Sequence, residues 1–155
     1  MADSLEPEAR EKLSMFLMEL HEDLDFLMKH SNLLIHDVEL RAKLEKAWRK
    51  TEPRFDNAEL YLRKGLRRGY LEKRGLVGDE LYFKLAVYER EREAVRAKVE
   101  DEGKHRGHEG WWWHIGSRVF HGFGDIVDSI LSSLGIPGVE AIGEFKDAYK
   151  VASGG

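Results

Sequence analysis

Apolar side chains recur along this chain every three or four residues, which is the spacing of one face of a helix. Between Leu5 and Ile35 this spacing predicts a single long amphipathic helix. Its inward-facing residues are expected to be Leu13, Leu17, Leu20, Leu24, Leu27 and Leu34. A second helix is predicted from Asp37, a residue type that caps helix N-termini, to Lys50. Its buried candidates are Val38, Leu40, Leu44 and Trp48.

Two further helices are predicted before the composition of the chain changes. A third runs from Pro53 to Arg74, and a fourth begins at Asp79, another suitable N-cap. Charges on the fourth helix are spaced to pair along it, as Glu89 is with Arg92. The inward-facing residues of these two helices are expected to be Phe55, Leu62, Leu66, Tyr82, Leu85, Tyr88, Val95 and Val99.

The last third of the chain is more apolar and aromatic than the rest. Its helical stripe consists of Val119, Phe123, Ile126, Ile130 and Leu134. A short final helix carries Val139, Ile142, Phe145 and Tyr149. No alternating strand pattern occurs, so the expected fold class is all-α. Residues 1–103 are predicted to form a bundle of about four helices, residues 104–110 a polar glycine and histidine hinge, and residues 111–152 an appended C-terminal helical hairpin.

The composition fits a soluble globular protein of one domain. The 155 residues are 42% hydrophobic and 35% charged, and the net charge is −4. Absence of cysteine excludes disulfides, thiol nucleophiles and thiolate zinc sites. The acidic N-terminus does not resemble a signal peptide and no apolar window reaches membrane length, so we expect a cytoplasmic protein. Glutamine is absent while Lys, Arg and Glu are abundant, a bias that favours a thermophilic source.

Charge is distributed unevenly along the first half of the chain. Residues 1–39 carry ten acidic and three basic side chains, whereas residues 41–74 carry five acidic and twelve basic ones. One interpretation is that these helices pack side by side with complementary surfaces. The alternative is a stripe that binds the phosphates of nucleic acid or anionic lipid, made of Arg63, Lys64, Arg67, Arg68, Lys73 and Arg74. The acidity of the whole chain argues against nucleic acid.

Four of the seven histidines fall between Lys104 and Gly124. Imidazoles are common ligands of zinc and other divalent metals, so a metal site is a second alternative. Its candidate ligands are His105, His108, His114 and His121. Their spacing matches no known metal motif, and the lead-in would have to fold back for all four to meet. The remaining histidines, His21, His30 and His36, are expected on the flank of the first helix.

Three consecutive tryptophans stand at the start of the apolar segment. Successive residues of a helix are about 100° apart around its axis, so the three indoles cannot all enter one core. Tryptophan is favoured at protein interfaces, where its ring is buried and its N–H stays hydrated. The predicted interface consists of Trp111, Trp112, Trp113, Val119, Phe123, Ile126 and Ile130. A structural alternative is that this segment completes the core of the bundle.

No arrangement typical of an enzyme is recognisable in the sequence. It contains no G-x-S-x-G motif and no phosphate-binding loop. Helical metal centres use Glu-x-x-His pairs on facing helices, whereas Glu19 and His21 are two apart and His36 precedes Glu39 in reversed order. We therefore expect a non-enzymatic helical protein without a cofactor that associates with itself or another protein through the tryptophan-rich segment. The alternatives are that the protein binds a divalent metal such as zinc, a nucleic acid or a membrane surface.

Overall fold

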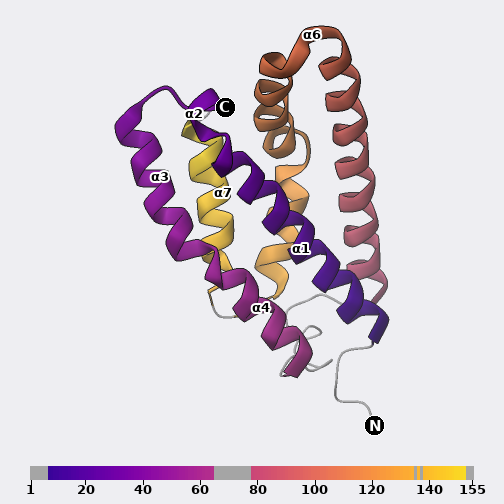
Figure 1. The fold of residues 1–155 in the computed structure, drawn as a ribbon. Helices are drawn as coiled ribbons and strands as arrows, with labels where there is room; N and C mark the ends of the chain where they lie inside the picture. Colours follow the sequence, from indigo (N-terminus) through magenta and orange to yellow (C-terminus); the bar gives the residue numbers. More distant parts are fainter. Residues whose placement is uncertain (1–6, 65–77, 135, 137, 153–155) are drawn as a thin grey trace.

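The computed structural model describes the chain except for residues 1–6, 65–77, 135, 137 and 153–155 (Figure 1). Over residues 102–123 and at a few other helical positions, it describes the backbone alone. The elements are α1 (Pro7–Lys29), α2 (Ser31–Leu34), α3 (Val38–Thr51), α4 (Pro53–Lys64), α6 (Gly78–Leu134) and α7 (Glu140–Ala152). No strand occurs in these described parts, and the predicted all-α fold is confirmed.

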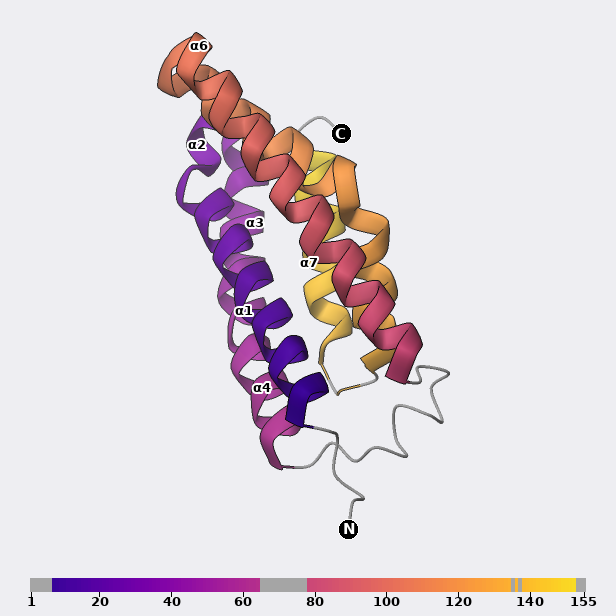
Figure 2. The same cartoon turned by 90° about the vertical axis from the view of Figure 1, so that its right-hand side faces the viewer.

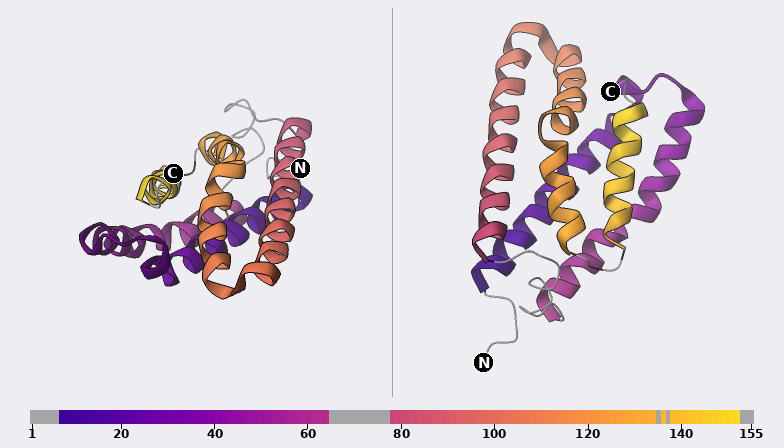
Figure 3. Two further views of the ribbon diagram at one scale, coloured as in Figure 1. Left: turned by 90° about the horizontal axis from the view of Figure 1, so that it is seen from above. Right: turned by 180° about the vertical axis from the view of Figure 1, so that it is seen from behind.

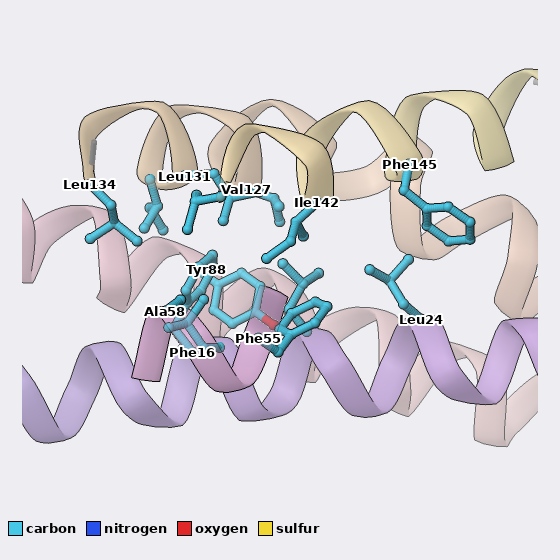
Figure 4. Close-up of a cluster of buried hydrophobic side chains, with 14 of the residues drawn as sticks. Phe16, Leu24, Phe55, Ala58, Tyr88, Val127, Leu131, Leu134, Ile142 and Phe145 are labelled. Atoms are coloured by element: carbon cyan, nitrogen blue, oxygen red, sulfur yellow. The ribbon is translucent and has the colours of Figure 1, made fainter. Parts of the chain in front are cut away.

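The helices lie in two layers, which Figure 2 shows edge-on. One layer holds α1 and the α3–α4 pair, and the other holds α6 and α7; the view from above in Figure 3 shows the same division. Between the layers lies a single cluster of buried apolar side chains (Figure 4). It draws on Phe16 and Leu24 of α1, Tyr88 and Val127 of α6, and Phe145 of α7, so residues on both sides of the predicted hinge share one core.

Helix α1 follows its predicted pattern but is shorter than predicted. The predicted leucines from Leu13 to Leu27 are all buried. The helix ends at Lys29 instead of continuing to Ile35. His30 follows it with φ −110° and ψ 19°, and its Nδ1 donates to the carbonyl oxygen of Phe26 at 2.9 Å. Such side-chain bonds to the preceding turn compete with helix propagation, and α2 then starts as a separate turn.

Helices α3 and α4 begin where the sequence indicates. The Oδ1 of Asp37 accepts a hydrogen bond from the Leu40 amide at 3.1 Å, so its predicted N-cap role is confirmed. Leu44 and Trp48 are buried, whereas Val38 is exposed and its predicted burial is wrong. Val38 is the first residue of α3, so no preceding helical turn covers it. Helix α4 buries Phe55, Ala58 and Leu62.

Helix α6 doubles back on itself, and the backbone stays helical through the predicted hinge at residues 104–110. All 57 of its residues are helical, yet Lys84 Nζ donates to Ser129 Oγ at 2.8 Å. In a straight helix these residues would be about 68 Å apart. The chain therefore rises in an outgoing arm, reverses, and descends in a return arm (Figure 1). Arms of equal length would place the reversal near residues 106 and 107, where Gly103, Gly107 and Gly110 lower helix propensity.

Helix α7 fills the space between the return arm and α3, as the rear view in Figure 3 shows. The turn before it uses Gly138 at φ 89°, a conformation that side chains disfavour. Its predicted inward residues are buried, and Phe145 packs on Trp48 of α3 with ring centroids 5.1 Å apart. Tyr149 donates its hydroxyl to the Leu27 carbonyl oxygen of α1 at 3.0 Å. This helix therefore ties the two layers together.

Candidate functional site at the contact between α1 and α6

Charged side chains meet inside the contact between α1 and the outgoing arm of α6. Glu19 and Asp23 are four residues apart on α1, and this spacing places them one above the other on the same flank. Arg92 of α6 comes one turn after Tyr88, whose ring packs edge-on against Phe16 of α1 at 4.7 Å. The aromatic contact fixes the two helices at this level, so the next turn brings the charges together.

Arg92 binds two carboxylates at once. Its Nε and Nη2 donate to Oδ2 and Oδ1 of Asp23 at 3.0 and 2.9 Å, a bidentate arrangement. Its Nη1 lies 3.0 Å from Oε2 of Glu19. The side chains of Arg92 and Glu19 are only 11% and 10% exposed, so this ion pair is largely withdrawn from water. We name Glu19, Asp23 and Arg92 the charge cluster.

Burial changes the proton affinities of the charge cluster. The pKa of Glu19 is raised from 4.5 to about 7, first by burial and next by the neighbouring Glu89, while Arg92 opposes the shift. Burial also raises the pKa of Asp23, against the opposing effect of its hydrogen bonds with Arg92. For Arg92, burial is outweighed by Asp23 and its pKa is raised, so it stays charged. Burial likewise raises the pKa of Tyr88, and the negative charge of Asp23 raises it as well.

A second buried charge lies between the return arm of α6 and α7. Lys146 is almost fully buried, and its Nζ donates to Asp128 Oδ2 at 2.9 Å and to the Gly124 carbonyl oxygen at 3.3 Å. It also lies 3.0 Å from Oδ1 of Asp147. The two carboxylates are 43% and 63% exposed, so this cation is buried while its partners reach water. The arrangement holds α7 in register with the return arm.

Comparison with known protein families, curated proteins and solved structures finds no match. Function must therefore be argued from this chain alone. Among the described residues, no three His, Asp or Glu side chains are grouped so that they could hold a metal ion. Within the same residues, none of the helices has the length and apolar character needed to cross a bilayer.

The structure describes the side chains of only two residues of the predicted tryptophan interface. Ile130 is fully buried and Ile126 is half-buried against the core, so these two side chains support the fold rather than a free surface. The reason is that the return arm packs on α7 and the core along this stripe. For Trp111, Trp112, Trp113, Val119 and Phe123 the backbone is helical, and their side chains lie outside the described residues.

The other predicted sites lie mostly outside the described part of the chain. Of the basic stripe, Arg63 is exposed on the last turn of α4, whereas residues 65–77, which hold Arg67, Arg68, Lys73 and Arg74, are not described. The side chain of Lys64 is not described either. His105, His108, His114 and His121 lie on the helical backbone of α6, again without described side chains.

His21 differs from its predicted place on an outer flank. It is half-buried between helices, stacked on Phe55 of α4 at 4.7 Å with an interplanar angle of 11°. Its Nε2 lies 3.3 Å from Oε1 of Glu52, and its ring is 5.9 Å from that of Trp48. The side chain therefore belongs to the junction of α1, α3 and α4, because its position on the helix borders the leucine stripe.

Sequence reasoning missed the charge cluster. The sequence assigns Glu19 and Asp23 no role, and its helical spacing pairs Arg92 with Glu89 along the same helix. The available signal was the position of Glu19, which lies one turn after Phe16 and borders the buried stripe. A charged residue at such a border needs a partner on the facing helix. The sequence does not say which helix that is.

Proposed function

We propose that this protein is a non-enzymatic interaction protein that associates with itself or with another protein through the tryptophan-rich segment of α6. The observation that carries the proposal is the reversal of α6. It turns the middle of the helix into a tip that extends beyond the ends of the other helices (Figures 1 and 2). A tip of this kind can reach a partner without disturbing the core.

The position of the tryptophans supports this proposal. With the reversal near residues 106 and 107, Trp111–Trp113 lie within about two helical turns of the tip. Because the backbone is helical there, the three indoles leave the axis in directions about 100° apart. Together the three indoles span a wider part of the helix circumference than a single packed face of the helix can bury. At least one indole is therefore expected to be available to a partner.

The test compares the full chain with a variant that combines Trp111→Ala, Trp112→Ala and Trp113→Ala. Molar mass is measured by light scattering after size exclusion, and stability by urea unfolding. We expect the full chain to have a mass that is a multiple of 17.9 kDa and the variant to have 17.9 kDa. Both should unfold at the same urea concentration. Phe83→Ala, at an exposed site on the outgoing arm, is the matched control and should keep the mass of the full chain.

Stability separates the alternatives. If the indoles belonged to the core, removing them would cost several kcal/mol each, roughly 3–5 kcal/mol for a buried tryptophan. A variant that unfolds much earlier at unchanged mass would therefore contradict the proposal. A full chain that stays monomeric, with a variant of equal stability, would exclude self-association and leave docking of another protein.

A further inference from the structure

We infer that a row of exposed cations on α3 and the first turn of α4 binds the phosphate backbone of nucleic acid. We name this set the cation row, and it consists of Lys43, Lys46, Lys50 and Arg54. The row belongs to the layer opposite α6 (Figure 2). The inference is therefore independent of the tryptophan-rich segment and of what that segment binds.

Helical spacing places the cation row on one flank. Helices α3 and α4 keep one register across their junction, because their buried positions follow one another at intervals of three or four residues. These positions are Leu44, Trp48, Thr51, Phe55, Ala58 and Leu62. In the same register the members of the row lie within about 80° of one another around the axis, and the row extends over about 16 Å along it.

Most acidic residues of these two helices lie on the other flank, next to α1. They are Glu45, Glu52, Asp56 and Glu59. Oε1 of Glu52 lies 3.3 Å from Nε2 of His21, which places this flank against α1. Arg54 instead lies against the turn before α7, since a Cβ added to Gly138 would come within 3.0 Å of its Cδ. Only Glu39, in the first turn of α3, shares the flank of the cation row.

Among the described residues, no carboxylate pairs with the cation row. All four side chains are exposed, and none of them takes part in an ion pair there. Residues 38–64 carry eight basic and five acidic side chains, a net charge of +3, whereas the rest of the chain carries −7. This asymmetry orients the row toward a polyanion and turns the acidic surface away from it. The acidity of the whole chain lowers the affinity but does not remove this preference.

The chemistry of the flank favours nucleic acid over an anionic membrane. A contact between a cation and a phosphate of nucleic acid releases counterions, and this release supplies affinity that does not depend on sequence. Helices that bind membrane surfaces add apolar side chains that enter the lipid. No large apolar side chain is exposed between Lys43 and Arg54. Tyr61 follows two turns later on the same flank, and its exposed ring can stack on a base.

The first experiment measures binding to a fluorescently labelled DNA duplex by anisotropy, at salt concentrations from about 20 to 150 mM. The natural chain is compared with a variant that combines Lys46→Gln and Lys50→Gln. The control combines Lys29→Gln and Arg90→Gln, which removes the same charge from exposed positions elsewhere. Four phosphate contacts predict a slope of log affinity against log salt of about −3 to −4, and the first variant should reduce it to about −2. The control should keep the slope of the natural chain.

Two results would overturn the inference. One is a natural chain that does not bind the duplex at the lowest salt concentration, and the other is a slope that Lys46→Gln with Lys50→Gln leaves unchanged. Urea unfolding of each variant shows whether the fold is retained. Sedimentation with vesicles of phosphatidylserine and phosphatidylcholine tests the membrane. Binding to these vesicles without binding to DNA would assign the row to a membrane surface and contradict the inference.

The second experiment removes an acid instead of a cation. Glu39→Gln should tighten binding to the same duplex, because Glu39 lies on the flank of the row, one turn before Lys43. Glu45→Gln makes an equal change of charge on the other flank and should tighten binding less. Anisotropy at one fixed salt concentration measures both affinities. Equal effects of the two substitutions would show that only net charge matters and would contradict a localised row.

Discussion

The two arms of α6 are parts of one helix but are held in place by different kinds of contact. The return arm places Val127, Ile130, Leu131 and Leu134 in the core, so its contact with α1 and α7 is apolar at these four positions. The outgoing arm has a shorter apolar stretch, through Leu81, Leu85 and Tyr88, and then depends on the ion pairs of Arg92. Apolar burial does not change with pH, whereas a contact between ionisable groups does. The difference predicts that substitutions of charged residues affect the outgoing arm more than the return arm.

The two buried cations sharpen the same contrast. Arg92 has partners that are themselves mostly buried, whereas the carboxylates around Lys146 reach water. A carboxylate that loses its cation can be hydrated only where water has access to it. Removing the two cations is therefore expected to have very different consequences, although the chemical change is similar.

The largest effect is expected from Arg92→Met. It leaves the carboxylates of Asp23 and Glu19 in a contact that excludes water, and unfolding free energy should fall by about 3–5 kcal/mol. Urea unfolding at neutral pH measures this loss. Replacing all three groups at once, as Arg92→Met with Asp23→Leu and Glu19→Leu, should recover most of it. A loss below about 1 kcal/mol for the single change would show that the ion pairs contribute little.

An intermediate effect is expected from Ile130→Ala in the return arm. The side chain is fully buried, and the cavity left behind should cost about 3 kcal/mol. Because no ionisable group is involved, the loss should be the same at about pH 5 and pH 8. Ser132→Ala, at an exposed position on the same arm, should change stability by less than about 0.5 kcal/mol. A loss for Ile130→Ala that varies with pH would remove the contrast between the arms.

The smallest effect is expected from Lys146→Met. Methionine keeps much of the buried side-chain volume, and Asp128 and Asp147 can be hydrated once the cation is gone. Unfolding free energy should change by less than about 1 kcal/mol in either direction. The same urea titration measures this change in unfolding free energy. A loss as large as that of Arg92→Met would show that exposure of the partners does not control the effect.

Much of the fold was predictable from apolar spacing. The buried leucines of α1, the cap at Asp37 and the inward residues of α7 follow from local rules that hold within single helices. The end of α1 at Lys29 was not predicted, although the bond of His30 to Phe26 that accompanies it is local. The reversal of α6 was indicated only as a hinge at residues 104–110, without the contacts between its two arms, because these join residues distant in sequence. Lys84 meeting Ser129 is an example, since 45 positions separate them and neither residue signals the other.

The candidate site was less predictable than the fold. A helical spacing of three favours pairing Glu89 with Arg92 along the chain, but Arg92 instead reaches 69 positions back to Asp23. Charge pairing across a bundle depends on which flanks the apolar stripes bring together, and this is known only once the layers are assembled. The tryptophan segment stays a prediction drawn from sequence and supported by its place on the helical backbone.

The proposed function depends on the reversal of α6, which a distance measurement tests directly. The chain has no cysteine, so Phe83→Cys with Ser132→Cys provides two unique exposed sites for spin labels. Packed helices have axes about 8–10 Å apart, so the labels should be less than about 30 Å apart by pulsed electron resonance. A straight α6 would separate these positions by about 74 Å. A distance near that value would contradict the folded-back arms, and with them the projecting tip on which the proposed function rests.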